Sequence, residues 1–311
     1  MAIVTGAGAG LGREYALHLA AAGAAVVVND VGHDADGSSA DRVADEIRAA
    51  GGRAVADRNT VATPDGATAI VATAVAQFGG LDIVVANAGI VRRGSIDQLS
   101  VDDVRSVLSV NLDGAIWVAQ AAFPLLKAQG RGRIVLATSS AGIYGHGLGA
   151  NYCASKGGVV GLLRALAIEG AEHGLRTNAV SPFALTPMTS TTPGRRADDA
   201  DRLDPAHVAP VVVFLASDGC DLNGQVLAVA GGTVARTFSA TTQGWRTPPG
   251  TPVTAEAVRD NLEQILDPVG AAMPANVQEE KWHLLDPADR GEPLPAAVGS
   301  GGRHEGTGTD G

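Results

Sequence analysis

Short apolar runs alternate with longer amphipathic segments along most of the 311-residue chain. The short runs lack charged residues, which is typical of strands that helices cover on both faces of a parallel sheet. Strands are predicted at 2–4, 25–28, 83–86, 134–137 and 226–229, and helices at 11–22, 38–50, 64–78, 101–127, 150–172 and 205–216. This alternation predicts an α/β fold, a doubly wound parallel sheet with helices on both faces.

The composition of the chain changes near residue 238. We expect residues 1–238 to form one folded domain, since the alternating pattern ends there. Residues 239–285 contain prolines, Trp245 and Trp282. We expect them to form an ordered extension, with a helix at 254–266, that packs on the core or on a partner subunit. Residues 286–311 are rich in Pro, Gly, Ala and charge, so a disordered tail is predicted there.

Charge and cysteine content exclude several classes of protein. The formal net charge of −10 opposes binding to nucleic acid phosphates. No apolar run approaches the ~20 residues of a membrane span, and the first residues lack a signal sequence. Cys153 and Cys220 cannot form a disulfide framework and lack the spacing of a zinc site. We therefore expect a protein of the reducing cytoplasm with no metal, membrane or nucleic acid partner.

A glycine-rich loop separates the first strand from the first helix. Glycines allow the backbone to approach a pyrophosphate closely, and the helix N-terminus offers free N–H groups to that anion. A glycine-rich turn without a ligand would have a similar sequence, so the motif is weak alone. The loop residues predicted to bind a dinucleotide are Gly6, Gly8, Gly10, Leu11 and Gly12.

Asp30 strengthens this interpretation because it ends the second strand, about twenty residues after the loop. A carboxylate there can accept hydrogen bonds from both hydroxyls of the adenosine ribose, and it would repel a 2′-phosphate. No arginine immediately follows Asp30, whose next neighbours are Val31, Gly32 and His33. The sequence therefore predicts NAD as the cofactor instead of NADP. The alternative is that Asp30 only caps the following turn.

Tyr152 and Lys156 open a predicted helix shortly after the strand at 134–137. Residues four apart share one face of a helix, so the ammonium of Lys156 could lower the pKa of Tyr152 and make it a proton donor and acceptor. Taken alone, this spacing is more often a surface pair. A serine at the preceding strand end, Ser139 or Ser140, could hold the substrate oxygen.

Together these motifs resemble the short-chain dehydrogenase/reductase family. The resemblance also includes Asn87-Ala88-Gly89 after the fourth strand and Asn111 in the next helix. It implies a Rossmann sheet of about seven strands, a nicotinamide cofactor and homodimers or homotetramers built through the two longest helices. The family's serine usually precedes its tyrosine by thirteen positions, which selects Ser139. The implied catalytic tetrad is Asn111, Ser139, Tyr152 and Lys156.

The resemblance also implies a role for each of these side chains. Tyr152 would be the general acid and base, and Ser139 would orient the substrate oxygen. Lys156 would bind the nicotinamide ribose, and Asn111 would support a proton-relay water from a distorted helix. The remaining implied cofactor contacts are Asn59, Asn87, Ala88, Gly89, Pro182 and Thr186. The family usually has an aspartate that contacts the adenine after the third strand. In this chain Asn59 occupies that position, or the contact shifts to Asp57.

Two stretches narrow the resemblance further, residues 27–32 and 138–152. Both resemble the (3R)-hydroxyacyl-CoA dehydrogenase part of peroxisomal multifunctional enzyme type 2, and the likeness runs to about residue 270. It implies an oxidoreductase of lipid metabolism that interconverts a (3R)-hydroxyacyl-CoA and its 3-oxoacyl-CoA. Many chemistries share this fold and tetrad, so other substrates stay open, namely an acyl-carrier-protein thioester, a steroid or a polyketide-like metabolite. A non-catalytic NAD-sensing module is a further alternative.

Overall fold

The computed structural model describes residues 1–35, 37–186, 199–248 and 250–285. The chain divides into two units, Met1–Thr237 and Phe238–Gly311, and each is described by itself. The predicted tail at 286–311 lies outside the described residues. In the described part of the chain, no helix has the length and apolar character needed to cross a membrane.

The first unit is built on an eight-stranded sheet of order β10-β9-β8-β7-β6-β1-β2-β5. Seven strands are parallel, as predicted, and β10 adds an antiparallel edge by pairing with β9. The chain order reverses at β1, which lies between β2 and β6, and such a switch point is where open α/β sheets bind ligands. The strands are β1 (Ala2–Thr5), β2 (Ala25–Asn29), β5 (Arg53–Asp57), β6 (Ile83–Ala86), β7 (Gly132–Ala137), β8 (Leu175–Phe183), β9 (Val226–Ala230) and β10 (Thr233–Thr237).

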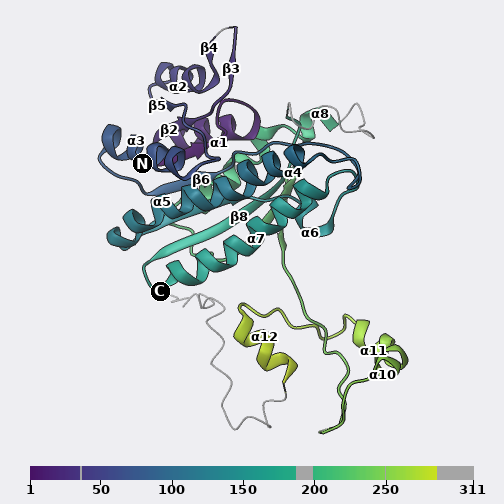
Figure 1. Cartoon of the computed structure of the whole chain (residues 1–311). Helices are drawn as coiled ribbons and strands as arrows, with labels where there is room; N and C mark the ends of the chain where they lie inside the picture. Colours follow the sequence, from purple (N-terminus) through teal and green to yellow (C-terminus); the bar gives the residue numbers. More distant parts are fainter. Residues whose placement is uncertain (36, 187–198, 249, 286–311) are drawn as a thin grey trace, which may run out of the picture. The chain divides into compact units, whose positions relative to one another are not determined.

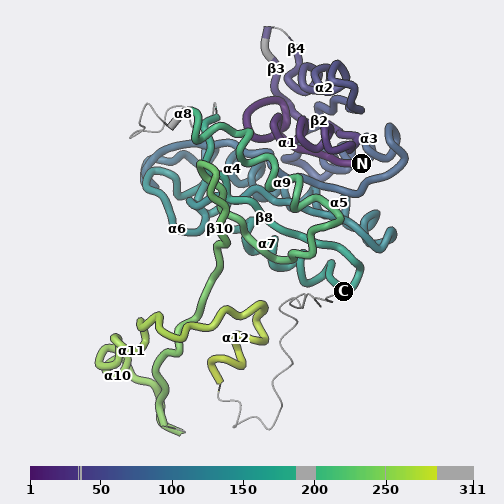
Figure 2. The backbone as a smooth tube through the Cα atoms, turned by 180° about the vertical axis from the view of Figure 1, so that it is seen from behind, coloured from purple at the N-terminus to yellow at the C-terminus, as the bar shows by residue number. Residues whose placement is uncertain are grey.

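Helices cover both faces of this sheet (Figures 1 and 2). One face carries α1 (Gly10–Ala21), α2 (Ser39–Ala49) and α9 (Ala209–Ala216), and the other carries α3 (Pro64–Phe78), α5 (Gly114–Gln129) and α7 (Ala150–Ala171). Successive side chains of a strand point to opposite faces, so Val26 and Val28 pack with the first set of helices and Val27 with the second. This explains why the strands read as unbroken apolar runs.

The predicted helix at 101–127 is wrong as a single element. It begins as α4 (Val101–Leu108), continues as a π-helical turn at Ser109–Asp113, and resumes as α5. The π turn contains Asn111, one of the predicted catalytic residues. Such turns inside α-helices are frequent at functional sites.

Short elements complete the first unit. A small hairpin of β3 (His33–Asp34) and β4 (Gly37–Ser38) precedes α2. The predicted helix at 205–216 begins as a 3₁₀ turn, Pro205–His207, before α9. The structure also contains α6 (Ala141–Tyr144) and α8 (Asp199–Arg202), which the sequence pattern did not predict.

Up to residue 285, where the description ends, the second unit contains three short helices. They are α10 (Ala255–Asp260), α11 (Leu262–Leu266) and α12 (Val277–Leu284). The predicted helix at 254–266 therefore breaks at Asn261, and the Thr254 side chain caps its start by accepting the backbone N–H of Ala257 at 3.2 Å. Thr241 and Ala272 exchange two backbone hydrogen bonds of 2.9 and 2.8 Å, which tie the start of the unit to its middle.

Candidate active site

The glycine loop after β1 has a backbone path that side chains would obstruct. Gly6 has a φ of +64°, a conformation that L side chains rarely adopt. A Cβ on Gly12 would lie 2.1 Å from the carbonyl oxygen of Gly6, so the loop and the helix can meet only without one. Helix α1 starts at Gly10, and its N-cap residue, Ala9, has no side chain to accept the first N–H groups. These donors are available to an anion.

The neighbouring strand β6 holds this loop in place. The Thr5 hydroxyl accepts the backbone N–H groups of Asn87 at 3.0 Å and Ala88 at 3.1 Å. In return, the Asn87 side-chain amide donates to the carbonyl oxygens of Thr5 at 3.0 Å and Gly6 at 3.2 Å. Asn87 and Ala88 therefore fix the carboxyl ends of β1 and β6 relative to each other.

Asp30 lies beside the same loop. Its carboxylate accepts the backbone N–H groups of Gly8 at 2.9 Å and Gly32 at 2.7 Å, and the Ser39 hydroxyl at 3.1 Å. The hydrogen bond from Gly32 shows that Asp30 caps the following turn, which was the alternative role considered for it. Asp30 also lines the cleft that the loop borders, so the same carboxylate caps the turn and faces the cleft.

Helix α7 places Lys156 in a buried position under the end of β7. Its Nζ donates to the carbonyl oxygen of Ala137 at 2.7 Å and lies 6.0 Å from the centre of the Tyr152 ring. Burial lowers the pKa of Lys156 from 10.5 to about 8 because the charged form loses water. Lys156 therefore gives up its proton more readily than an exposed lysine does.

The pKa of Tyr152 shifts in the opposite direction from the one expected. Burial raises the pKa of Tyr152, and a hydrogen bond from Ser139 offsets part of that rise. The expectation that Lys156 lowers this pKa is therefore wrong for the protein alone, because desolvation dominates and the Lys156 ammonium is directed at Ala137. The structure does bring Ser139, Tyr152 and Lys156 together, as the motif predicted.

Asn111 is buried in the π turn and binds the loop after β6. Its Oδ1 accepts the N–H of Ile90 at 2.7 Å, and its Nδ2 donates to the Ile90 carbonyl at 3.0 Å and to the Ser155 hydroxyl at 3.3 Å. A Cβ on Gly89 would lie 3.4 Å from Asn111 Oδ1 and 3.6 Å from Lys156 Nζ. Asn111 and Lys156 thus face the same small space, and the relay-water role of Asn111 stays a prediction.

A cleft of about 250 Å³ joins these two groups of residues. The glycine loop and Asp30 line part of it, and Tyr152 and Lys156 line another part. Eleven of the predicted cofactor residues and three unpredicted ones, Ala9, Ala137 and Thr138, are in its lining: Gly6, Ala9, Gly10, Leu11, Gly12, Asp30, Asn87, Gly89, Ala137, Thr138, Tyr152, Lys156, Pro182 and Thr186. Thr138 could have been found from the sequence, because it stands directly before Ser139 at the strand end.

Asn59 is not among the lining residues of the cleft. It is exposed, while Asp57 is buried and accepts hydrogen bonds from the Asn59 side chain at 2.9 Å, the Asn29 side chain at 2.8 Å and the Thr73 hydroxyl at 2.7 Å. Asp57 is therefore fully engaged within the fold. Of the two positions considered for adenine contact, Asn59 is the one that remains accessible.

The residues of the cleft fit a dinucleotide with a reactive ring at its far end. Gly6, Gly8 and Gly12 leave no room for Cβ atoms, and the loop presents backbone N–H groups, which is how proteins bind a pyrophosphate. The opposite end offers the Tyr152 phenol and the Lys156 ammonium group. A family model described as short chain dehydrogenase matches residues 1–197. The chain belongs to this family. It is an oxidoreductase that acts on alcohols with a nicotinamide cofactor.

Two relatives show the extent of the similarity. A protein of Mycobacterium tuberculosis assigned as a short-chain type dehydrogenase/reductase is 46% identical over 239 residues, which are 75% of this chain and 83% of the relative. Peroxisomal multifunctional enzyme type 2 of Mus musculus is 41% identical over 294 residues, or 91% of this chain. The match covers only 39% of that mouse enzyme, so the chain is similar to one part of it.

Solved structures agree on the fold. Full-length peroxisomal multifunctional enzyme type 2 from Drosophila melanogaster superimposes with a TM-score of 0.77 at 37% identity, covering 90% of this chain and 47% of that one. A Beutenbergia cavernae protein assigned as an NAD(P)-dependent gluconate 5-dehydrogenase has a TM-score of 0.67 at 38% identity. The superposition covers 74% of this chain and 95% of that one. That structure holds NADP at low occupancy, so the family relationship leaves the choice between NAD and NADP open.

Proposed function

We propose that this protein is an NAD-dependent dehydrogenase that interconverts a (3R)-hydroxyacyl-CoA and its 3-oxoacyl-CoA. The observation that carries the proposal is a single cleft, bordered by an anion-binding loop with Asp30 and by Tyr152 with Lys156. The similarity to multifunctional enzyme type 2 over 91% of the chain supports the acyl-CoA substrate. The protein would act in the cytoplasm as a homodimer or homotetramer.

Asp30 supports the choice of NAD. Its carboxylate lines the cleft next to the glycine loop, where a ribose with two free hydroxyls can donate to it. A 2′-phosphate at that place would bring a second negative charge against the carboxylate, which the local backbone N–H groups already hold in position. NAD avoids this repulsion.

The loops around the catalytic residues support a substrate with an apolar chain. Four apolar side chains at the carboxyl edge of the sheet are more than half exposed. Ile96 follows β6, Tyr144 and Leu148 follow β7, and Phe183 is the last residue of β8. A backbone hydrogen bond of 3.1 Å from Gly94 to the Leu148 carbonyl joins two of these loops. Exposed apolar side chains gathered at one edge favour binding of an apolar ligand.

In this proposal the chain's own groups handle the proton. The bound cofactor supplies the hydride acceptor for oxidation and the hydride donor for reduction. Tyr152 moves a proton to or from the substrate oxygen, and Ser139 holds that oxygen. Because burial raises the pKa of Tyr152, its phenol is protonated at neutral pH, which suits reduction of a ketone. Oxidation of the alcohol should then become faster as the pH rises above neutral.

The test compares two tyrosine variants of the full chain. Tyr152→Phe should lower kcat by roughly 10²–10⁴-fold, the usual contribution of general acid–base catalysis, and NADH should still bind. Tyr15→Phe is the matched control, since Tyr15 is buried in α1 and its hydroxyl has no hydrogen-bond partner among the described residues. It should keep full activity. Near-normal turnover in Tyr152→Phe would contradict the proposed mechanism.

The substrate is tested with a panel followed by NADH absorbance. It contains (3R)- and (3S)-hydroxyacyl-CoA esters of several chain lengths, an acyl-carrier-protein thioester, a steroid alcohol and cyclohexanol. We expect the (3R)-hydroxyacyl-CoA esters to have the highest kcat/KM. A higher value for the steroid or for the carrier-protein thioester would replace the proposed substrate, and no turnover of any alcohol would favour the sensing module.

A further inference from the structure

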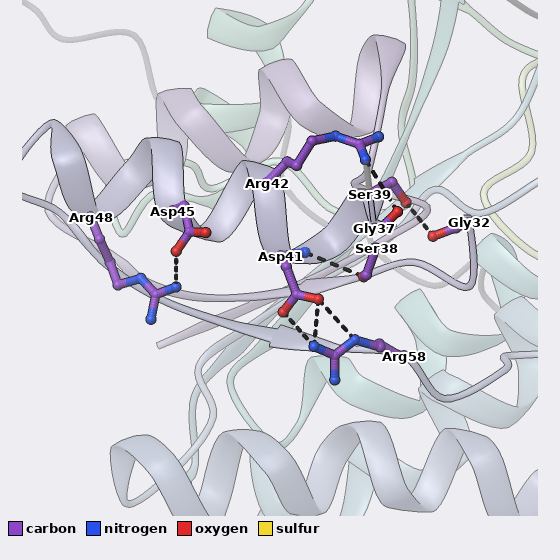
Figure 3. A network of polar contacts seen from close by, with 9 residues as sticks. All are labelled: Gly32, Gly37, Ser38, Ser39, Asp41, Arg42, Asp45, Arg48 and Arg58. Atoms are coloured by element: carbon purple, nitrogen blue, oxygen red, sulfur yellow. Dashed lines mark hydrogen bonds and ion pairs between the residues drawn. The ribbon is translucent and has the colours of Figure 1, made fainter. Parts of the chain in front are cut away.

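An ion pair between Asp41 and Arg58 joins α2 to the residue that directly follows β5 (Figure 3). Asn29, the last residue of β2, pairs with Asp57, the last residue of β5. Asp30 directly follows Asn29 and Arg58 directly follows Asp57, so these two residues occupy equivalent places at the ends of adjacent strands. A backbone hydrogen bond of 3.0 Å from Asp30 to the Asp57 carbonyl continues this pairing. Arg58 is thus the arginine that the sheet brings to the neighbouring strand end.

Asp41 binds this arginine through both carboxylate oxygens. Arg58 Nε donates to Oδ2 at 2.9 Å and Nη2 donates to Oδ1 at 2.5 Å, which is the two-pronged geometry that arginine also forms with phosphate. The Arg58 guanidinium holds the pKa of Asp41 below its usual range. Asp41 is itself placed by the N-cap of α2, where its N–H donates to Ser38.

Other arginines around α2 also have acceptors. Arg48 pairs with Asp45, Arg13 pairs with Glu46, and Arg42 donates to the carbonyl oxygen of Gly37 at 3.2 Å. A 2′-phosphate near Asp30 would therefore have to take Arg58 from Asp41. That exchange would leave two carboxylates, Asp30 and Asp41, close to the phosphate dianion.

We propose that Asp41 determines cofactor specificity by holding Arg58 in an ion pair and so withholding it from a 2′-phosphate. The inference rests on the proposed use of NAD, and it adds a second exclusion device to Asp30. Asp30 repels the phosphate directly, whereas Asp41 acts through Arg58. Both Asp41 and Arg58 have side chains more than a third exposed, so a phosphate in solution could reach Arg58 once Asp41 no longer holds it.

The experiment measures binding of two adenosine fragments to the full chain by calorimetry. AMP lacks the 2′-phosphate and adenosine 2′,5′-bisphosphate carries it. Wild-type protein should bind AMP more tightly. Asp41→Asn should shift the ratio of the two dissociation constants toward the bisphosphate by about tenfold, and the shift should shrink at higher salt. NADP and NAD should show the same shift.

Two further variants separate the proposal from a general charge effect. Asp45→Asn removes the same charge one turn along α2 and releases Arg48 instead, so it should leave the ratio within about twofold of wild type. Asp41→Asn combined with Arg58→Ala should lose the shift. The inference is overturned if Asp45→Asn gives an equal shift or if the double variant keeps it.

The same binding measurements test the role of Asp41 separately from the proposed use of NAD. A wild-type protein that binds the bisphosphate and NADP more tightly than AMP and NAD would refute the proposed use of NAD. A wild-type protein that prefers AMP and NAD, together with an unchanged ratio in Asp41→Asn, would refute only the role of Asp41.

Discussion

Lys156→Met should stabilise the cofactor-free protein. Lys156 is 5% exposed and donates only to the Ala137 carbonyl, and the described residues include no carboxylate paired with it. Burial lowers its pKa from 10.5 to about 8, and this difference corresponds to roughly 3 kcal/mol of free energy at pH 7. Methionine keeps the length of the side chain and removes the charge. Loss of the bond to Ala137 costs about 1 kcal/mol, so the net gain is about 2 kcal/mol.

The pH dependence gives the sign of this effect. Below pH 8, Lys156 is charged in both the folded and the unfolded protein, and folding bears the full cost of burying the charge. Between pH 8 and about pH 10.5, the folded protein has released this proton and the unfolded chain still holds it, so the stability of the wild type rises relative to the variant. The stabilising effect of Lys156→Met should therefore shrink with increasing pH and be absent near pH 10.5.

Urea unfolding at several pH values measures this difference. Lys127→Met is the matched control, because Lys127 is exposed near the end of α5 and its replacement should change the free energy of unfolding by less than about 0.5 kcal/mol. Lys156→Met should also lose most of its turnover. A destabilised Lys156→Met protein, or a stability difference that stays constant from pH 7 to pH 10.5, would refute the reasoning.

Three other predictions follow from the site and its surroundings. Asp30→Ala should narrow the preference for NAD over NADP, measured as the ratio of kcat/KM values, and a wild type that favours NADP would contradict it. Light scattering should show a homodimer or homotetramer, and a 31.3 kDa monomer at micromolar concentration would contradict the expected assembly. Leu148 has a φ of +60°, so Leu148→Gly should raise the free energy of unfolding by about 0.5 kcal/mol and Leu148→Ala should not, while both raise KM for long-chain substrates.

Five of the seven parallel strands could be predicted because they are short apolar runs, whereas β5 and β8 contain charged residues and were not found from this pattern. Ile3, Val4, Val27 and Val28 are all fully buried, and such runs need no knowledge of tertiary structure to be recognised. Strand β10 was missed because it is an exposed edge strand, in which Val234 is 52% exposed and its neighbours are polar or small. An edge strand depends on its partner, here β9, and not on its own pattern.

The π turn could not be predicted from local pattern. Asn111 makes its hydrogen bonds to Ile90, twenty-one residues earlier, and to Ser155, forty-four residues later, so its contacts exist only after the sheet and α7 have assembled. The pKa of Tyr152 likewise depends on the assembled fold. Its spacing from Lys156 was readable in the sequence, but the burial that raises its pKa comes from the packed fold.

Local departures from stable structure gather near the catalytic residues. Among the described residues, Leu148 is the one non-glycine residue with positive φ, and it lies four positions before Tyr152. Within the described ranges, no carboxylate pairs with the buried Lys156, and Asn111 lies in a π turn next to the space that Lys156 faces. Features of this kind cost stability when no ligand is bound, and in proteins they cluster at sites that bind ligands. Lys156 lines the cleft itself, and Asn111 and Leu148 lie close to it in space or in sequence.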